Sequence, residues 1–264
     1  MTKQCIKLVL TVCAVGLGLV GCGRPQAEWT CAQVQEQLAC SENKAIQPVS
    51  RNNNTRWAQR QDAVNARVQQ GNVDLLFLGD SITHGWERHE ALWTKYFGQW
   101  NAVNAGFSGD QTQHLLWRIE NGNIAGINPK VVVIMIGTNN APAATAEEIA
   151  EGIAAIVCKL RTELPETKIL LLAIFPRGTN EQRNAKADAT YNPEWAKIDQ
   201  ASLLASRLAD GHKIYYLDIN KSFLNEEGVL TQDVMPDLLH PNAKGYELWG
   251  EAMLPTLQKL MTAQ

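Results

Sequence analysis

The stretch VDLLFLGDSITHGW, residues 73–86, joins an apolar run to a pair of polar residues. The run over 73–79 is almost continuously apolar, which is typical of a strand buried on both faces of a parallel sheet. Asp80 and Ser81 stand directly where this predicted strand ends. They either cap the helix that follows or belong to a site, because ligands of such sheets bind outside the carboxyl ends of the strands.

Four further apolar runs predict strands, and stretches with helical periodicity separate them. The additional strands are expected over 100–106, 130–137, 168–176 and 212–219. The helices are expected over 56–71, 110–120, 144–164, 192–209 and 243–261. Buried strands that alternate with helices indicate a three-layer α/β/α sandwich around a five-stranded parallel sheet.

Length and composition fit one globular domain of this class. The chain has 264 residues, of which 45% are hydrophobic and 19% are charged, as is usual for a folded protein. The formal net charge of -3 argues against a nucleic-acid partner, which would require a basic surface.

The N-terminus is typical of an export signal. Lys3 and Lys7 flank the start of an apolar segment over 8–20 that is too short for an ordinary membrane-spanning helix. The segment ends in LVGC, residues 19–22, which resembles the bacterial lipobox. We therefore expect a lipoprotein signal peptide over 1–21, lipidation at Cys22 and attachment to a membrane of the bacterial cell envelope, with Gly23 favouring the outer membrane. Plain secretion with an unmodified Cys22 is the alternative.

Residues 22–55 carry scattered Gln, Asn and Pro without apolar periodicity, and we expect a tether there, ahead of a domain over 56–264. Export to an oxidising compartment favours a disulfide between Cys31 and Cys40, with two free thiols as the alternative. Cys158 lies among apolar residues and is expected to be a buried small hydrophobe. The sequence has no CxxC pair and no HExxH spacing, so we expect no metal site. No organic cofactor is expected either.

Polar residues at the ends of the predicted strands fit the chemistry of a serine hydrolase. A serine hydroxyl needs a base that takes its proton and an acid that orients the base. Ser81 follows the first strand, and Asp237 and His240 lie three residues apart before the last helix. An oxyanion also needs hydrogen-bond donors, for which we expect the backbone N–H groups of Ser81 and Gly106 and the side chain of Asn139.

Four segments together resemble the sequence blocks of the SGNH (GDSL-type) hydrolases, and they occur in the family's order. They are GDSI (79–82), NAGFSGDQT (104–112), IGTNN (136–140) and DLLHPN (237–242). The longer string NAGFSGDQTQHLLWRIENG is similar to the α subunits of platelet-activating-factor acetylhydrolase and their bacterial relatives. Ile82 replaces the leucine of the name motif, a departure that touches no catalytic group.

The resemblance implies a flavodoxin-like SGNH fold, with Ser81 as nucleophile, His240 as base, Asp237 as the orienting acid, and Gly106 and Asn139 as oxyanion donors. It implies an esterase that removes short acyl groups, with acetyl favoured, through an acyl-enzyme. The ester could be a small molecule or a glycan. Two alternatives stay open, namely an acyltransferase with the same triad and a glycan-binding lipoprotein without turnover.

Several other residues compete for these roles or could line the substrate site. His84 is a rival base without an obvious orienting acid, Ser108 is a rival nucleophile that fits a turn or cap better, and Asp218 is a rival acid at the end of a strand. We expect Asp80, His84 and Trp86 to line the substrate site. Each predicted catalytic residue alone has a simpler reading as a cap, a turn or a surface side chain, and their combination favours catalysis.

Overall fold

A computed structural model describes residues 29–38, 41–178 and 193–262. Within these residues, five strands form one parallel sheet in the order β2-β1-β3-β4-β5. The strands are β1 (Leu75–Gly79), β2 (Ala102–Gly106), β3 (Val131–Met135), β4 (Lys168–Leu172) and β5 (Ile214–Leu217). The predicted five-stranded parallel sheet is confirmed, and every observed strand lies inside its predicted range.

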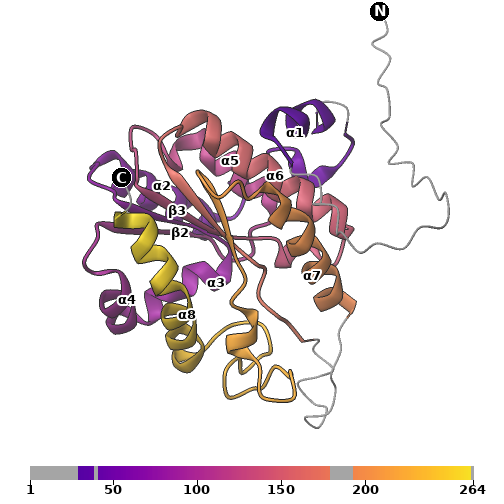
Figure 1. The fold of residues 1–264 in the computed structure, drawn as a ribbon. Helices are drawn as coiled ribbons and strands as arrows, with labels where there is room; N and C mark the ends of the chain where they lie inside the picture. Colours follow the sequence, from indigo (N-terminus) through magenta and orange to yellow (C-terminus); the bar gives the residue numbers. More distant parts are fainter. Residues whose placement is uncertain (1–28, 39–40, 179–192, 263–264) are drawn as a thin grey trace, which may run out of the picture.

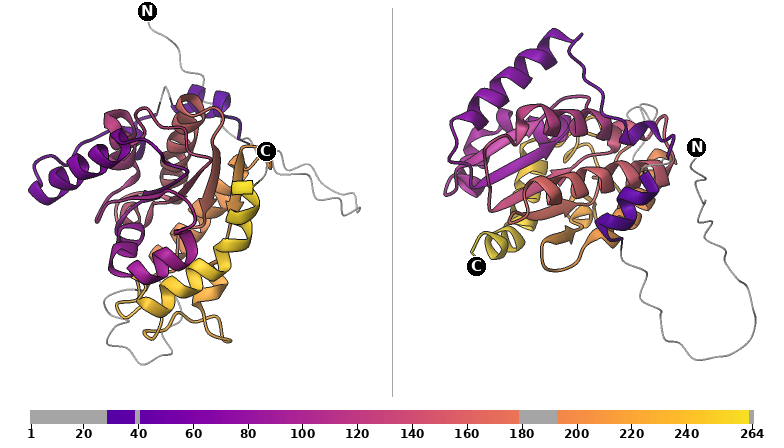
Figure 2. Two further views of the ribbon diagram at one scale, coloured as in Figure 1. Left: turned by 90° about the vertical axis from the view of Figure 1, so that its left-hand side faces the viewer. Right: turned by 90° about the horizontal axis from the view of Figure 1, so that it is seen from above.

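Helices cover both faces of the sheet (Figures 1 and 2). One face carries α1 (Cys31–Leu38), α2 (Thr55–Gln69), α5 (Thr112–Arg118), α6 (Ala146–Glu163) and α7 (Pro193–Ala205). The other carries α3 (Ser81–His84), α4 (Glu90–Phe97) and α8 (Ala243–Thr262). Short single-turn helices η1 to η6 lie over 44–46, 85–88, 119–123, 138–140, 206–208 and 220–223. The three-layer α/β/α architecture is therefore as predicted.

Successive residues of each strand feed the two cores in turn, as the strand period of two requires. In β1, Leu76 and Leu78 pack into the core under α2, α5 and α6, whereas Leu75 and Phe77 pack into the core under α4 and α8. All four side chains are fully buried. This two-sided burial explains why β1 reads as a continuous apolar run in the sequence.

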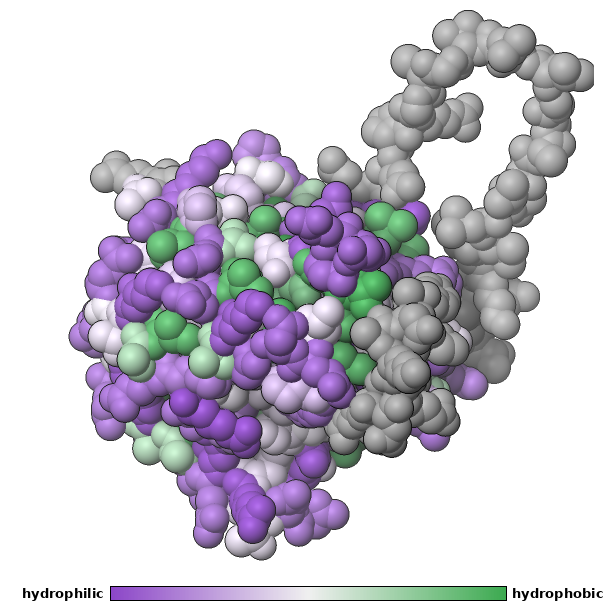
Figure 3. Space-filling model, turned by 90° about the horizontal axis from the view of Figure 1, so that it is seen from below, coloured by the Kyte–Doolittle hydropathy of each residue, from purple (hydrophilic) through white to green (hydrophobic). Residues whose placement is uncertain are grey.

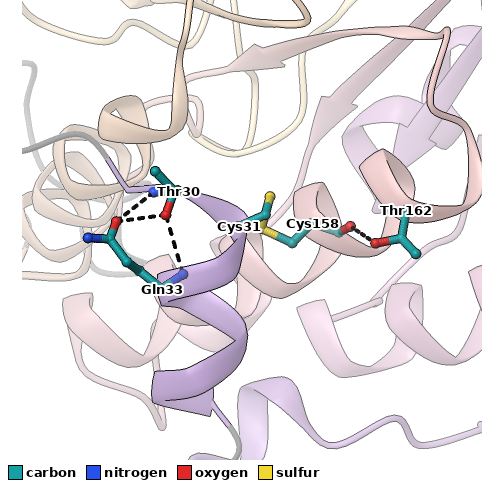
Figure 4. Close-up of a disulfide and its surroundings, with 5 residues drawn as sticks. All are labelled: Thr30, Cys31, Gln33, Cys158 and Thr162. Carbon is teal, nitrogen blue, oxygen red and sulfur yellow. Dashed lines mark hydrogen bonds between the residues drawn. A yellow bond between two sulfur atoms is a disulfide. The ribbon is translucent and has the colours of Figure 1, made fainter.

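The N-terminal part of the domain corrects two predictions. Helix α1 begins with a capping pair, in which the Gln33 N–H donates to Thr30 Oγ1 at 3.3 Å and the Thr30 N–H donates to Gln33 Oε1 at 3.1 Å (Figure 4). Cys31 of this helix forms a disulfide with Cys158 of α6, with Cα atoms 5.2 Å apart. The expected Cys31–Cys40 pairing is therefore wrong, and Cys158 is a buried disulfide partner rather than a free small hydrophobe.

The segment that was expected to be a tether also packs on the domain. Asn43 is buried, and its Nδ2 donates to the Glu148 carbonyl of α6 at 2.9 Å. The carbonyl of buried Ala45 accepts a hydrogen bond from Thr112 Oγ1 of α5 at 2.7 Å. The tether prediction over 22–55 is thus wrong for the described residues of that range, 29–38 and 41–55. The predicted signal peptide, Cys22 and Cys40 lie outside the described residues.

No helix within the described ranges has the length and apolar character needed to cross a membrane. Figure 3 shows the molecule from below relative to Figure 1. On this face the coloured residues are mostly hydrophilic, and hydrophobic residues form smaller patches between them.

Candidate active site

A cavity of about 720 Å³ lies at the carboxyl end of the sheet. Its walls come from the segments that follow β1, β2 and β3 and from the segment that precedes α8. Among the described lining residues, Leu239 is the only large apolar side chain, and the others are mostly polar or charged. The polar lining residues are Ser81, His84, Glu87, Arg88, Ser108, Asn139, Asp237 and His240. The cavity is therefore suited to polar ligands.

The end of β1 places Ser81 at the first position of α3. Asp80 caps this helix, because its Oδ1 accepts the N–H of Ile82 at 3.0 Å. Gly79 is required here, since a Cβ atom would overlap the side chain of Thr83 and the carbonyl oxygen of Met135. The strand can consequently turn sharply into the helix and present Ser81 at the carboxyl end of the sheet.

Helix α8 supports the same turn from the opposite side. Tyr246 is buried, and its hydroxyl donates to the carbonyl oxygen of Ile82 at 2.6 Å. At Gly85, which ends α3, a Cβ atom would overlap that hydroxyl. The short helix that carries Ser81 is therefore fixed by β1 and by α8.

Ser81, His240 and Asp237 form one hydrogen-bonded chain. Ser81 Oγ lies 2.8 Å from His240 Nε2, and His240 Nδ1 lies 2.7 Å from Asp237 Oδ2. The other carboxylate oxygen accepts the backbone N–H groups of Leu239 at 3.1 Å and His240 at 2.7 Å. Leu238, which lies between Asp237 and Leu239, has a φ of 55°. This conformation is uncommon for a leucine, and it accompanies the tight loop.

The charge of Asp237 determines which groups donate and which accept in this chain of hydrogen bonds. Partial burial acts to raise the pKa of Asp237, but hydrogen bonds from the His240 side chain and backbone outweigh it and hold the pKa below its usual value. Asp237 is therefore ionised at neutral pH and can only accept hydrogen bonds. It fixes the proton of neutral His240 on Nδ1, which leaves Nε2 free to accept the proton of the Ser81 hydroxyl.

The donor side of the site corrects the sequence prediction for Gly106. The N–H of Gly106 donates to Asn104 Oδ1 at 2.9 Å, and this residue is buried at the end of β2, away from the cavity. Its lack of a side chain serves packing, because a Cβ atom would collide with the backbone of Thr83 and His84 in α3. Gly106 as an oxyanion donor is therefore wrong.

Gly109 is the glycine that reaches the cavity from this segment. It lines the cavity with a φ of 77°, a conformation that glycine adopts without strain. Asn139 lines the same cavity from the turn after β3, and its Nδ2 donates to the Asp110 carbonyl at 2.9 Å. An amide nitrogen carries two hydrogens, so this bond orients the side chain and leaves its second donor available.

Buried charges hold the β2 loop in place. Arg118 of α5 is fully buried, and its guanidinium donates to Asp110 Oδ2 at 2.7 Å, to the Ala105 carbonyl at 3.1 Å and to the Gly79 carbonyl at 3.2 Å. The guanidinium carbon also lies 3.9 Å from the centroid of the Phe107 ring. Arg118 thus connects the ends of β1 and β2 to the loop that carries Gly109.

Of the other residues that the sequence suggested for the site, some line the cavity and some do not. His84 and Ser108 both line the cavity, and His84 Nδ1 lies 3.0 Å from Ser108 Oγ. Asp80 and Trp86 are fully buried and do not line this cavity, so their prediction as lining residues is wrong. Asp218 Oδ1 instead accepts the N–H of Asn220 at 2.8 Å in the turn after β5.

Asp80 and Trp86 are each buried in a distinct environment beneath the segment that carries Ser81. Burial raises the pKa of Asp80 to about 7, and a hydrogen bond from the Ile82 N–H only partly offsets it. Trp86 belongs to an aromatic cluster, with ring centroids 4.7 Å from Tyr246, 5.1 Å from Phe97 and 5.2 Å from Trp249. Both side chains stabilise the segment around Ser81 from within.

This geometry provides the parts of an acyl-transfer site. It contains a hydroxyl bonded to a histidine, a carboxylate behind that histidine, and N–H donors at the start of a helix, at a glycine and at an amide. No group of three or more metal-ligating His, Cys, Asp or Glu side chains occurs in the described part of the chain.

Comparisons with known proteins agree with this arrangement. Residues 77–248 match the sequence profile of the GDSL-like Lipase/Acylhydrolase family. The human platelet-activating factor acetylhydrolase IB subunit alpha2 is 34% identical over 195 residues, covering 72% of this chain and 79% of that protein.

Solved structures show the same fold at lower identity. A structure described as an acylhydrolase of Bacteroides fragilis has a TM-score of 0.61 and 21% identity, covering 78% of this chain and 98% of that one. A GDSL-like lipase of Bacteroides thetaiotaomicron has a TM-score of 0.54 and 21% identity, covering 78% and 97%. The family profile and the 34% identical relative show that this chain belongs to the GDSL-like lipase/acylhydrolase family and is a carboxylic ester hydrolase.

Proposed function

We propose that the protein hydrolyses esters of short acyl groups, with acetyl preferred, through an acyl-enzyme on Ser81. The observation that carries the proposal is the chain from Ser81 Oγ to His240 Nε2 at 2.8 Å and from His240 Nδ1 to Asp237 at 2.7 Å. Such a chain activates a serine hydroxyl and stabilises the imidazolium that forms.

In the proposed reaction, Ser81 Oγ attacks the acyl carbon and its proton passes to His240 Nε2. The carbonyl oxygen becomes an oxyanion, which receives hydrogen bonds from the backbone N–H groups of Ser81 and Gly109 and from Asn139 Nδ2. The C–O bond to the alcohol then breaks as His240 donates its proton to the leaving oxygen. Water repeats the same steps on the acyl-enzyme and releases the acid.

The preference for a short acyl group has two supports. Leu239 is the only large apolar side chain among the described residues that line the cavity, so a long acyl chain would find little apolar surface there. The similar mammalian proteins are named acetylhydrolases, and the same acyl class is proposed for this chain.

The test is hydrolysis of p-nitrophenyl esters from acetate to octanoate by the purified protein and by Ser81→Ala. We expect kcat/KM to fall with acyl length, and kcat to fall by as much as ~10⁶ in the variant. Equal rates for all acyl lengths would refute the short-acyl specificity. A folded Ser81→Ala variant with full activity would refute the nucleophile.

We also propose that the protein is a lipoprotein of the bacterial cell envelope, attached through Cys22. The support is in the sequence, where LVGC at residues 19–22 follows a basic start and a short apolar segment. Metabolic labelling with a palmitate analogue should mark the wild type and not Cys22→Ala. Absence of label from both proteins would refute lipidation at Cys22.

A further inference from the structure

The catalytic cavity contains a second serine–histidine–carboxylate arrangement. His84 Nδ1 lies 3.0 Å from Ser108 Oγ, and His84 Nε2 lies 3.4 Å from Glu87 Oε2. All three residues line the same cavity as Ser81 and His240. The mechanism proposed above uses none of these three side chains.

The charges determine how this second arrangement is protonated. Burial acts to raise the pKa of Glu87, but hydrogen bonds from His84 and Arg60 overcome it and lower the pKa to about 2. Glu87 is thus a carboxylate that can only accept, so the tautomer of His84 that suits it has the hydrogen on Nε2, facing Glu87. His84 Nδ1 then accepts the hydrogen of the Ser108 hydroxyl, so Ser108 Oγ has its lone pairs left for a donor in the cavity.

The position of this group indicates which part of an ester it meets. His84 follows Ser81 by three residues on α3, and residues with this spacing lie on one side of a helix. Ser108 directly precedes Gly109, whose N–H we assign to the oxyanion. A group held beside both Ser81 and the oxyanion loop lies close to the reacting ester, and the polar lining suits an alcohol with hydroxyl groups.

We propose that Ser108, held by His84 and Glu87, binds a hydroxyl group next to the ester oxygen, so that the preferred alcohols are polyhydroxylated, as in an acylated sugar. This inference rests on the proposed esterase function and specifies its alcohol. Ser108 Oγ accepts a hydrogen bond from the neighbouring hydroxyl of the substrate. The side chain therefore selects the substrate and takes no part in bond breaking.

The experiment compares two esters that differ by one hydroxyl, cyclohexyl acetate and trans-2-hydroxycyclohexyl acetate. For the wild type we expect kcat/KM to be about three- to tenfold higher for the hydroxylated ester, the effect of one hydrogen bond. Ser108→Ala should bring this ratio close to one, and Ser108→Thr, which keeps a hydroxyl, should restore part of it. Ser206→Ala, in the segment that enters β5 at the opposite edge of the sheet, is the matched control and should keep the wild-type ratio.

Each other outcome has a separate meaning. A wild-type ratio of one, with both esters hydrolysed, would overturn the subsite and leave the esterase function intact. An equal loss of rate on both esters in Ser108→Ala would also overturn it, because the serine would then only hold the loop of Gly109. Failure of the wild type to hydrolyse either ester would instead overturn the proposed function.

Discussion

Asn139 is a residue at which we expect a substitution to change activity without changing stability. Its side chain is oriented by the bond from Nδ2 to the Asp110 carbonyl, and its remaining amide hydrogen is available to the oxyanion. We expect Asn139→Ala to lower kcat for p-nitrophenyl acetate by about 10²–10³. The urea midpoint of unfolding should change little, because the side chain is only partly buried. An unchanged kcat would remove Asn139 from the oxyanion site.

The site shows which single residues a sequence can predict. Ser81, Asp237 and His240 stand in motifs whose order and spacing carry their roles, and the structure brings them into one chain. The predicted glycine donor, Gly106, uses its N–H within the fold, whereas Gly109, three residues later, lines the cavity. The error arises because the direction of an N–H depends on backbone torsions. A φ of 77° at Gly109 cannot be read from the letters GFSGD, although the glycine itself is a signal for such a turn.

Asp80 should make stability depend on pH in an unusual direction. Its pKa rises from 3.8 to about 7 in the folded state, so the native protein binds more protons than the unfolded chain between these values. The free energy of unfolding from this group therefore falls as pH rises from about 4 to about 7 and is constant above.

The corresponding test is Asp80→Asn, which keeps an oxygen for the Ile82 N–H and cannot ionise. Urea unfolding of both proteins should be measured from about pH 4 to about pH 8. The free energy of unfolding of the variant minus that of the wild type should increase by on the order of 3 kcal/mol across that window and should not change outside it. A difference that is the same at every pH would show that Asp80 is ionised throughout. The sign excludes an explanation through Asp237, whose pKa is lowered.

At the scale of elements, the strands were the most predictable part of the chain. β1 and β3 are buried along their whole length because helices cover both sides of the sheet, and that burial leaves an unbroken apolar run of letters. The edge strands β2 and β5 are only partly buried, and β2 includes Asn104. Helix α1 was missed because it is short and buries little besides Val34. Its capping pair, Thr30 and Gln33, was the available signal. Helix α4 was missed in the same way, since its eight residues follow two other short turns.

The loop after β2 depends on α5 through one buried charge. We expect Arg118→Met to lower the free energy of unfolding by about 3–5 kcal/mol. Asp110 Oδ2 and the carbonyls of Ala105 and Gly79 would lose their buried donor, while Arg51 still pairs with Asp110 Oδ1. The activity should fall as well, since the loop carries Gly109. Lys159→Met is the comparison on α6, where a partly exposed ion pair with Glu163 at 3.1 Å is worth at most about 1 kcal/mol. Similar losses in both variants, measured by urea unfolding, would contradict the argument.

At the scale of the whole molecule, the cysteine pairing was the part that sequence could not determine. Cys31 and Cys40 are near neighbours in the chain, whereas Cys158 is 127 residues away from Cys31. Connectivity does not follow from spacing, and pairing requires Cα atoms about 4.4–6.8 Å apart, which only the packing of α1 on α6 provides. The N-terminal segment was expected to be a tether for the same reason, because the contacts that hold it on the domain, such as those of Asn43 with Glu148 and of Ala45 with Thr112, are with distant residues.

The Cys31–Cys158 bond should stabilise the fold without taking part in catalysis. A crosslink over 127 residues removes much conformational entropy from the unfolded chain, so Cys31→Ser/Cys158→Ser should lose about 2–5 kcal/mol. The disulfide joins two helices of one outer layer, and neither cysteine lines the catalytic cavity. Activity on p-nitrophenyl acetate well below the melting temperature should therefore persist, while urea unfolding shifts to lower concentration. Cys40→Ser is the control and should retain both the bond and the stability, whereas a peptide map that links Cys31 to Cys40 in the wild type would overturn the pairing.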